Sequence, residues 1–144
     1  MSDIEPIAAA GGVVYRKQDN HIEVLVIFRR GVWDLPKGKL EDDESISQCA
    51  QREVAEEVGL DELPTIITDL PDTYHEYQQG GTSFGKTTHW FAMQLQEPVE
   101  VFTPQVEEDI QKVRWMPLKE AFELVGYENL VEVLEAFAGK NIPL

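Results

Sequence analysis

The chain has 144 residues, of which 42% are hydrophobic and 27% are charged, as expected for one globular domain with its own core. Its 27 acidic and 12 basic residues give a formal net charge of -15. A chain this acidic repels nucleic-acid backbones and anionic membrane surfaces, so neither is expected as a partner. Binding a small anion would require a local basic patch or a bridging cation.

The cysteine content and the first residues bear on the compartment. Cys49 is the single cysteine, so an intramolecular disulfide is impossible and an intracellular setting is favoured. The N-terminal MSDIEPIAAAGG is acidic, and its apolar part is too short for a signal peptide. Apolar runs elsewhere are too short to span a membrane. We expect a single cytoplasmic domain covering residues 1–144, as a monomer or a homodimer.

Strands and helices are expected to mix along the chain. Runs of β-branched and aromatic residues bounded by turn residues predict the strands. Ser45 and Gln48 form a capping-box pattern at a helix start, and Gly59 suits the helix end. In chain order we expect strands at Ile7–Tyr15, Glu23–Phe28, Trp33–Leu35, Pro64–Leu70, Asp72–Tyr77, Thr87–Leu95 and Val113–Met116, and helices at Ser45–Val58, Pro117–Val125 and Asn129–Ala138.

Two segments between these elements are expected to be loops. Lys37–Glu44 follows Pro36 and carries Gly38, and Gln78–Lys86 (QQGGTSFGK) is rich in Gly, Ser and Thr. Strands mixed with two or three helices indicate an α/β or α+β sandwich.

Carboxylates fall on the apolar side of the first expected helix. At about 100° per residue, Glu57 projects almost in line with the apolar Ile46 and Ala50. Glu53 lies beside it, and Glu56 lies at the edge of the same arc. The i, i+3 and i+4 spacing of the three glutamates makes their side chains converge. Burying carboxylates beside an apolar stripe is costly unless they are paired, so these three need a partner.

The partner of these glutamates is the first functional question. One alternative is that they form an ordinary solvated face. Arg52 can compensate one of them, with Glu44 as its other partner, but it cannot neutralise three. A divalent cation can, and oxygen ligands without nearby histidine or cysteine favour Mg²⁺ or Mn²⁺ over Zn²⁺. Such a cation would also let a protein of charge -15 accept a phosphorylated substrate.

One stretch resembles the signature of a known family. Gly38, Glu44 after five intervening residues, and the run REVAEEVGL at Arg52–Leu60 fit the Nudix box, GX5EX7REUXEEXGU with U aliphatic, at every defined position. The strand through Gly11, the WDLPKGKL segment and the VRWMPLKEAFEL segment also resemble Nudix domains, so the resemblance covers nearly the whole chain.

The resemblance implies a fold and a reaction. The fold would be the Nudix fold, an α+β arrangement in which a mixed β-sheet lies between helices and the box forms a loop–helix–loop. The reaction would be hydrolysis of a nucleoside diphosphate linked to another group, by water that Mg²⁺ or Mn²⁺ activates. Arg52 and Glu44 would pair to orient the glutamates.

The same resemblance implies a metal site. Glu53, Glu56 and Glu57 match positions that ligate metal, and Glu53 or Glu57 would also act as the base for the attacking water. Gly38 would offer its backbone carbonyl to a metal. Many Nudix enzymes place a further carboxylate before the last strand, which here implies Glu108 as an additional ligand or base. A solvated acidic loop is the alternative for Glu108.

Basic residues cluster ahead of the box. Arg29, Arg30, Lys37 and Lys39 are four of the 12 basic residues and fall within eleven positions. Ordinary surface charge would account for any one of them. Lys37 and Lys39 lead to the expected metal site, so we predict that they contact phosphate, together with Arg29. Lys86, which follows the Gly-rich segment, is a further candidate for substrate binding.

The residues after the box bear on the substrate. Tyr77 lies seventeen residues after Leu60, a spacing similar to that of a tyrosine in Nudix enzymes that act on diadenosine polyphosphates. A tyrosine packed within a sheet is the alternative. KTTHWF at Lys86–Phe91 resembles a strand of dinucleoside polyphosphate and diphosphoinositol polyphosphate hydrolases. We therefore expect a dinucleoside polyphosphate such as diadenosine tetraphosphate as substrate. The alternatives are a (d)NTP, a diphosphoinositol polyphosphate, or a non-catalytic module that binds nucleotides.

Overall fold

The computed structural model describes residues 3–142. In chain order its elements are β1 (Ile4–Gln18), β2 (His21–Arg29), β3 (Val32–Asp34), β4 (Lys37–Lys39), α1 (Ile46–Val58), β5 (Thr65–Gln79), β6 (Thr82–Gln94), the 3-10 turn η1 (Val106–Glu108), β7 (Ile110–Pro117), α2 (Leu118–Leu124) and α3 (Glu128–Gly139).

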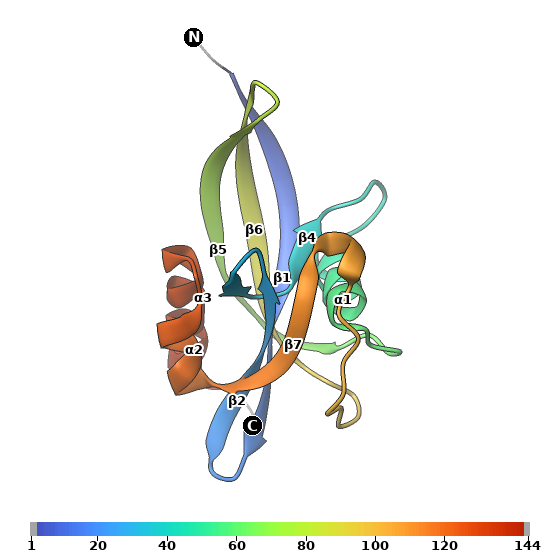
Figure 1. Cartoon of the computed structure of the whole chain (residues 1–144), viewed down its shortest axis with the longest axis vertical. Coiled ribbons are helices and arrows are strands. Elements are labelled where there is room, and N and C mark those ends of the chain that lie inside the picture. Colours follow the sequence, from blue (N-terminus) through green and yellow to red (C-terminus); the bar gives the residue numbers. More distant parts are fainter. Residues whose placement is uncertain (1–2, 143–144) are drawn as a thin grey trace.

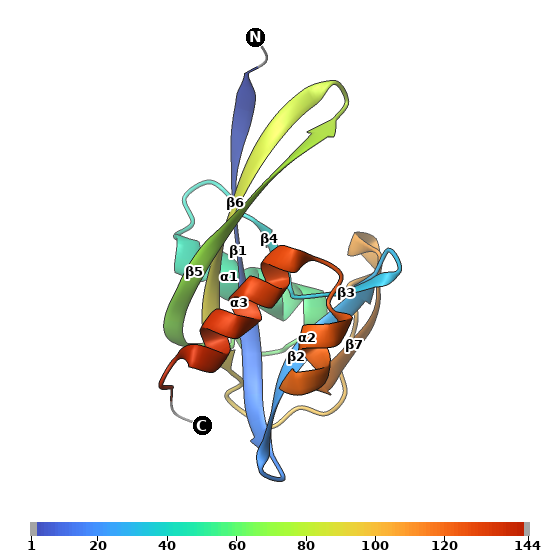
Figure 2. The ribbon, with the colours of Figure 1, turned by 90° about the vertical axis from the view of Figure 1, so that its left-hand side faces the viewer.

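The strands form one mixed sheet that opens out from β1. The N-terminal part of β1 pairs with β6 in parallel and with β4 antiparallel, whereas its C-terminal end pairs with β2. From there β2 continues to pair with β3 and β7. Helix α1 covers one side of the sheet and α2 with α3 cover the other, as Figures 1 and 2 show together. The expected α+β sandwich is confirmed.

Two apolar cores lie on opposite faces of the sheet. Alternate residues of a strand point to opposite faces, so Val13 belongs to the core under α2 and α3 and Val14 to the core under α1. On β2, Val24 and Leu25 divide in the same way. No helix within residues 3–142 is both long and apolar enough to cross a membrane.

Both loop predictions are partly wrong. Lys37–Lys39 is strand β4, whose residues pair with Ala9–Gly11 of β1. No strand signal marks this segment, because it has only three residues and its conformation depends on pairing with β1. At Gly11 the two backbones approach so closely that an added methyl group would overlap Pro36 and Lys37. This close approach places the Lys37–Lys39 segment against the sheet.

The Gly-rich segment Gln78–Lys86 is also mostly strand. Strands β5 and β6 pair through Gln79 and Thr82, so the turn is confined to Gly80 and Gly81, which both have positive φ. The two segments predicted at Pro64–Leu70 and Asp72–Tyr77 are one strand with a register shift between them. The β5–β6 hairpin extends well beyond the helices in Figure 2. Repeated cross-strand pairing holds Gly85 and Lys86, which have little strand propensity of their own.

Helix α1 begins and ends as predicted. The Ser45 side chain accepts a hydrogen bond from the backbone N–H of Gln48, and the Gln48 side chain accepts one from Ser45 N–H. Gly59 ends the helix with a φ of 77°. A cap of this kind contributes about 1 kcal/mol and, here, fixes where the acidic face of the helix begins.

Candidate active site

Arg52 lies at the centre of an acidic cluster on α1 and β4. Its Nε and Nη2 bond both carboxylate oxygens of Glu44, at 2.6 and 3.0 Å, and Nη2 also donates to the carbonyl of Lys39 at 3.1 Å. Its Nη1 bonds Glu53 at 2.9 Å and Glu56 at 3.2 Å. The Arg52–Glu44 pair that the sequence predicted is present. The hydrogen bond from Arg52 lowers the pKa of Glu44 to about 2, so Glu44 stays ionised.

Glu57 is a buried carboxylate, with only 2% of its surface exposed. One oxygen accepts a hydrogen bond from the backbone N–H of Lys37 at 3.1 Å, and the other lies 3.7 Å from Arg29. Burial raises the pKa of Glu57 to about 7, although both of these neighbours lower it. The predicted direction of Glu57, inward along the apolar side of the helix, is therefore correct.

Glu53 lies next to Glu57 and against β4. A methyl group added at Gly38 would overlap the Glu53 carboxylate, so the absent side chain of Gly38 makes room for that group. Burial raises the pKa of Glu53 against the opposing effect of Arg52, and Glu56 and Glu108 raise it further. The positive charge around Glu53 and Glu57 is thus too small to offset the cost of burying their ionised carboxylates.

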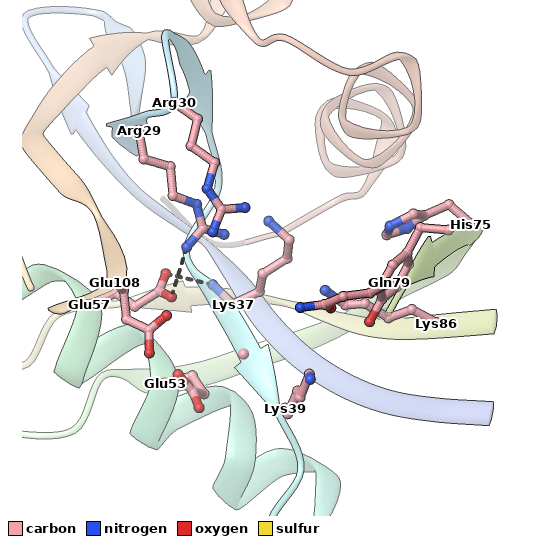
Figure 3. Close-up of a pocket in the computed structure, with 12 residues that line it drawn as sticks. Arg29, Arg30, Lys37, Lys39, Glu53, Glu57, His75, Gln79, Lys86 and Glu108 are labelled. Carbon is pink, nitrogen blue, oxygen red and sulfur yellow. Dashed lines mark hydrogen bonds and ion pairs between the residues drawn. The ribbon is translucent and has the colours of Figure 1, made fainter. Parts of the chain in front are cut away.

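A cavity of about 520 Å³ opens over these carboxylates. Glu53, Glu57 and Glu108 lie on one side of it, and His75, Gln79 and Lys86 lie across from them (Figure 3). The loop before β7 brings Glu108 there, because Gln105 N–H and Thr103 N–H donate to the last carbonyls of α1 at 3.1 and 3.0 Å. The further lining residues are Arg29, Arg30, Lys37, Gly38, Lys39 and Tyr77.

Glu56 is placed differently from the other two box glutamates. It does not line the cavity, its side chain is 46% exposed, and its nearest charged partner is Arg52. It remains close enough to Glu53 to raise the pKa of that residue. The convergence expected from the helical spacing therefore holds for Glu53 and Glu57 and leaves Glu56 at the rim.

A buried aspartate holds part of the cationic wall. Asp34, at the end of β3, accepts hydrogen bonds from Lys37 Nζ at 2.9 and 2.8 Å and from the backbone N–H of Leu35 at 2.8 Å. Arg29 lies 3.4 Å from the same carboxylate. Burial alone would raise the pKa of Asp34, but the two cations and the Leu35 N–H lower it overall. Asp34 thus fixes the positions of Lys37 and Arg29.

Lys86 has no such counterion within the described chain. Burial, together with the nearby positive charges of Lys37, Lys39 and Arg29, lowers its pKa to about 8. Its Nζ lies 5.9 Å from the centre of the Tyr77 ring, which stacks in turn on His75 and Phe84. Several cations facing one space without enough acids to neutralise them form a site suited to an anion.

The residues around the cavity are of the chemical type that binds a hard divalent cation. Within residues 3–142 no group of three or more histidine, cysteine, aspartate or glutamate side chains is arranged to hold a metal ion as it stands. The donors around the cavity are nevertheless carboxylates and the Gly38 backbone, which are oxygen ligands of the type that Mg²⁺ and Mn²⁺ prefer. Glu53 would have to exchange Arg52 for the metal, so the fit requires a side-chain rearrangement.

Sequence reasoning missed three lining or supporting residues. Asp34 is an acid between apolar residues in WDLP. Its place in the sequence between the basic residues Arg29 and Lys37 could have indicated an ion pair. His75 is two residues from Tyr77 on the same strand face, so strand alternation would have found it once Tyr77 was chosen. Gln79 was hidden because its segment was expected to be a loop.

The fold described here, a mixed sheet between helices, is shared with several solved structures. The E. coli dihydroneopterin triphosphate pyrophosphohydrolase superposes with a TM-score of 0.70 at 26% identity, covering 90% of this chain and 93% of the other. A C. elegans Ap4A hydrolase in a binary complex superposes with a TM-score of 0.66 at 23% identity, covering 92% and 95%. The latter likeness shows the fold alone.

Sequence comparison identifies the family. The model of the NUDIX domain matches residues 5–137, so the chain belongs to the Nudix family. Nudix hydrolase 13, mitochondrial, of Arabidopsis thaliana is 32% identical over 129 residues, covering 83% of this chain and 61% of that protein. The chain spans about three fifths of the length of the plant relatives it matches. The resemblance inferred from the box is confirmed.

Proposed function

We propose that this chain is a Mg²⁺- or Mn²⁺-dependent phosphohydrolase that cleaves a phosphoanhydride bond in a nucleoside diphosphate-linked substrate. One observation carries the proposal: carboxylates that need positive charge and cations that need negative charge face each other across a single cavity. A phosphate chain bridged to the acids by a divalent cation satisfies both sides. Relatives named as Nudix hydrolases support the same reaction class.

The side chains divide the work. Arg29, Lys37 and Lys86 bind and orient the phosphate oxygens, which also spreads the charge that builds up during cleavage. Glu53 and Glu57 would hold the metal with the Gly38 carbonyl, and Glu108, from the turn before β7 on the same side of the cavity, would add a ligand. When bound, the cation would supply positive charge for the phosphate oxygens and would activate the attacking water. A glutamate at the cavity wall accepts the proton of that water.

Fewer observations support the identity of the substrate than support the reaction. Tyr77 and Lys86 lie in the cavity, where a dinucleoside polyphosphate such as diadenosine tetraphosphate would need a ring to stack on and a cation beyond the cleaved bond. The likeness to a triphosphate pyrophosphohydrolase keeps (d)NTPs as an alternative. We further propose that the 144 residues act as one cytoplasmic catalytic unit, as a monomer or homodimer.

A substrate screen tests the reaction. Wild type and Glu57→Gln are assayed with Mg²⁺, Mn²⁺ or a chelator against diadenosine tetraphosphate, (d)NTPs, ADP-ribose and a diphosphoinositol polyphosphate. We expect metal-dependent turnover of a nucleotide and a loss of about 10²-fold or more in Glu57→Gln, because a base and a ligand are removed together. Glu62→Gln, on the exposed turn after α1, is the matched control and should keep full activity.

Two results would contradict the proposal. Equal turnover by wild type and Glu57→Gln in the presence of chelator would exclude the metal mechanism. Nucleotide binding without turnover of any compound in the screen would instead identify a non-catalytic binding module.

A further inference from the structure

The β1–β2 turn lies at the end of the molecule opposite the β5–β6 turn (Figures 1 and 2). A groove of about 670 Å³ opens there between the β1–β2 turn and the start of α2. The groove shares no lining residue with the cavity that holds the carboxylates. The proposed reaction therefore gives it no role.

The floor of the groove is an uncovered edge of the core under α2 and α3. Ile22, Leu118 and Phe122 pack against that core but remain only half-buried. Ile22 lies beyond the end of the pairing between β2 and β7, which stops at Glu23 and Pro117. Leu118 and Phe122 lie one turn apart on α2, so they extend the same apolar surface. Covering this surface with another molecule would be favourable, because it removes apolar groups from water.

The rim of the groove is basic. Lys17 and Lys119 are both exposed, and neither side chain makes an ion pair or a hydrogen bond within residues 3–142. Among the described residues, no acidic side chain lines the groove. In a chain of net charge -15, such a groove is suited to a partner surface that is both acidic and apolar.

The loop between β6 and β7 displays a surface of that chemistry. Val101 has 86% of its surface exposed, the largest fraction for any large hydrophobic residue that the structure describes. Glu97 and Glu100 precede it, and both are exposed. Glu100 bonds Arg16, whereas Glu97 makes no ion pair within residues 3–142. The loop thus offers one uncovered apolar side chain and one carboxylate without a counterion.

Hydrogen bonds hold this loop in place on both sides of Val101. The Val99 carbonyl accepts one from the Trp115 indole at 2.9 Å, and the N–H of Thr103 donates one to the Val58 carbonyl at 3.0 Å. Val101 therefore extends into solvent from a fixed backbone. Less conformational entropy is lost when a side chain docks from a backbone that is already ordered.

The groove and the acidic loop are neighbours on the molecule. Lys17 lines the groove and, together with Glu97 and Glu100, also lines a smaller depression beside it. Both surfaces therefore lie at the same end of the chain's fold. A two-fold rotation at this end can place the groove of each copy against the acidic loop of the other, which closes the contact within a homodimer.

We propose that the groove is a docking surface for a second copy of this chain, in which the partner's Val101 packs on Ile22 and Phe122 and the partner's Glu97 pairs with Lys119. The net charge of each copy opposes association. At physiological ionic strength, however, exposed charges more than about 8 Å apart are largely screened, so the pairs at the contact decide the outcome. The interface is separate from the carboxylates and goes beyond the proposed hydrolysis.

Sedimentation equilibrium of the full chain over a range of concentrations tests the interface. We expect wild type to pass from monomer to dimer as the concentration rises. Lys119→Glu, Glu97→Lys and Val101→Ser should each raise the dissociation constant about tenfold or more, as expected for residues at the centre of a contact. Lys140→Glu and Glu135→Lys change exposed charges outside both surfaces and should leave the dissociation constant unchanged.

Mixing two variants separates a specific contact from a general effect of charge. Lys119→Glu and Glu97→Lys should each be largely monomeric when alone. In an equimolar mixture one contact keeps the native pair and the other has the pair reversed, so a heterodimer should form. Circular dichroism melts on each variant confirm that the fold is retained.

Three results would overturn the interface. The first is a wild type that stays monomeric up to about 1 mM, since a weaker contact would carry no specificity. The second is a dimer that Lys119→Glu, Glu97→Lys and Val101→Ser all leave intact, because the copies would then associate through another surface. The third is a mixture of the two charge variants that remains monomeric. None of these results bears on metal-dependent turnover, which is measured separately.

Discussion

The two walls of the carboxylate cavity are assembled in different ways. The acidic wall comes mainly from one helix, where Glu53 and Glu57 are one turn apart and Arg52 is adjacent. The basic wall comes from the end of β2, from β4 and from β6, so Arg29 and Lys86 are distant in sequence and close in space. The acidic wall is therefore a local structure, whereas the basic wall depends on the register of the sheet.

The walls also differ in how their charges are balanced. The acids are held by one arginine that bonds three carboxylates, and by backbone N–H groups. The cations are held mainly by the buried Asp34, which contacts Lys37 and Arg29, whereas Lys86 has no counterion within residues 3–142. A change in the acidic wall should thus affect chemistry most, and a change in the basic wall should affect stability and substrate binding.

The largest effect on catalysis is expected at Gly38, which is tightly packed against Glu53 of the acidic wall. Gly38→Ala places a methyl group on the Glu53 carboxylate, which is the end of a flexible side chain and can move. We expect kcat to fall by about 10²-fold, the cost of a displacement of roughly 1 Å in a catalytic group. The melting temperature should change little, because no backbone needs to shift.

Gly139, which has open space around it, provides the control for this prediction. Gly139→Ala adds a methyl group where no atom lies within 4 Å, so both kcat and melting temperature should match wild type. If Gly38→Ala turned over substrate at the wild-type rate, Glu53 would not need its present position for catalysis.

The difference between the walls also explains what the sequence could predict. The inward direction of Glu57 follows from helical periodicity, and the Arg52–Glu44 pair follows from the box, so both were accessible from local patterns. The strand conformation of Lys37–Lys39 was not, because it depends on hydrogen bonds to Ala9–Gly11 of a strand far away in sequence.

Asp34 shows the same limit at a single side chain. Its two cations are nearby in sequence, but only the turn between β3 and β4 brings their charged ends to one carboxylate. The strand extension through Gln79 likewise required a partner strand, because the glycines of this segment weaken its strand signal. Features fixed by tertiary pairing were the ones that sequence patterns missed.

An intermediate effect is expected from removing the acid that holds the basic wall. Asp34→Asn leaves Lys37 and Arg29 facing each other without their counterion, so we expect the free energy of unfolding at pH 7 to fall by about 2 kcal/mol, less than for a fully buried pair because both cations are partly exposed. Urea denaturation of wild type and variant measures this difference. Asp43→Asn, on the exposed loop before α1, is the control.

The same aspartate predicts how stability depends on pH. Because the pKa of Asp34 is lower in the folded protein than in the unfolded chain, its carboxylate stabilises the fold fully above the unfolded pKa of about 4. That contribution is lost as the pH falls through the lower folded-state pKa. The gap in stability between wild type and Asp34→Asn should therefore close at acid pH, and a gap that stayed constant would show that the Asp34 charge is not the cause.

The smallest effect is expected at Lys86, which has no counterion among the described residues. The pKa of this lysine is lowered to about 8 by burial and by neighbouring cations, so its charge is lost at a pH where an ordinary lysine keeps it. We expect Lys86→Met to lower kcat/KM by about tenfold at pH 7, the value of one charge-assisted contact to phosphate. In wild type kcat/KM should decline above about pH 8, whereas Lys86→Met should lack that decline and Lys86→Arg should keep its activity there, since arginine remains charged. Lys140→Met, at the exposed end of α3, should behave as wild type. If kcat/KM of Lys86→Met declined above pH 8 in parallel with wild type, another group would be responsible for the titration. The phosphate-binding residues of the basic wall would then be Arg29, Lys37 and Lys39.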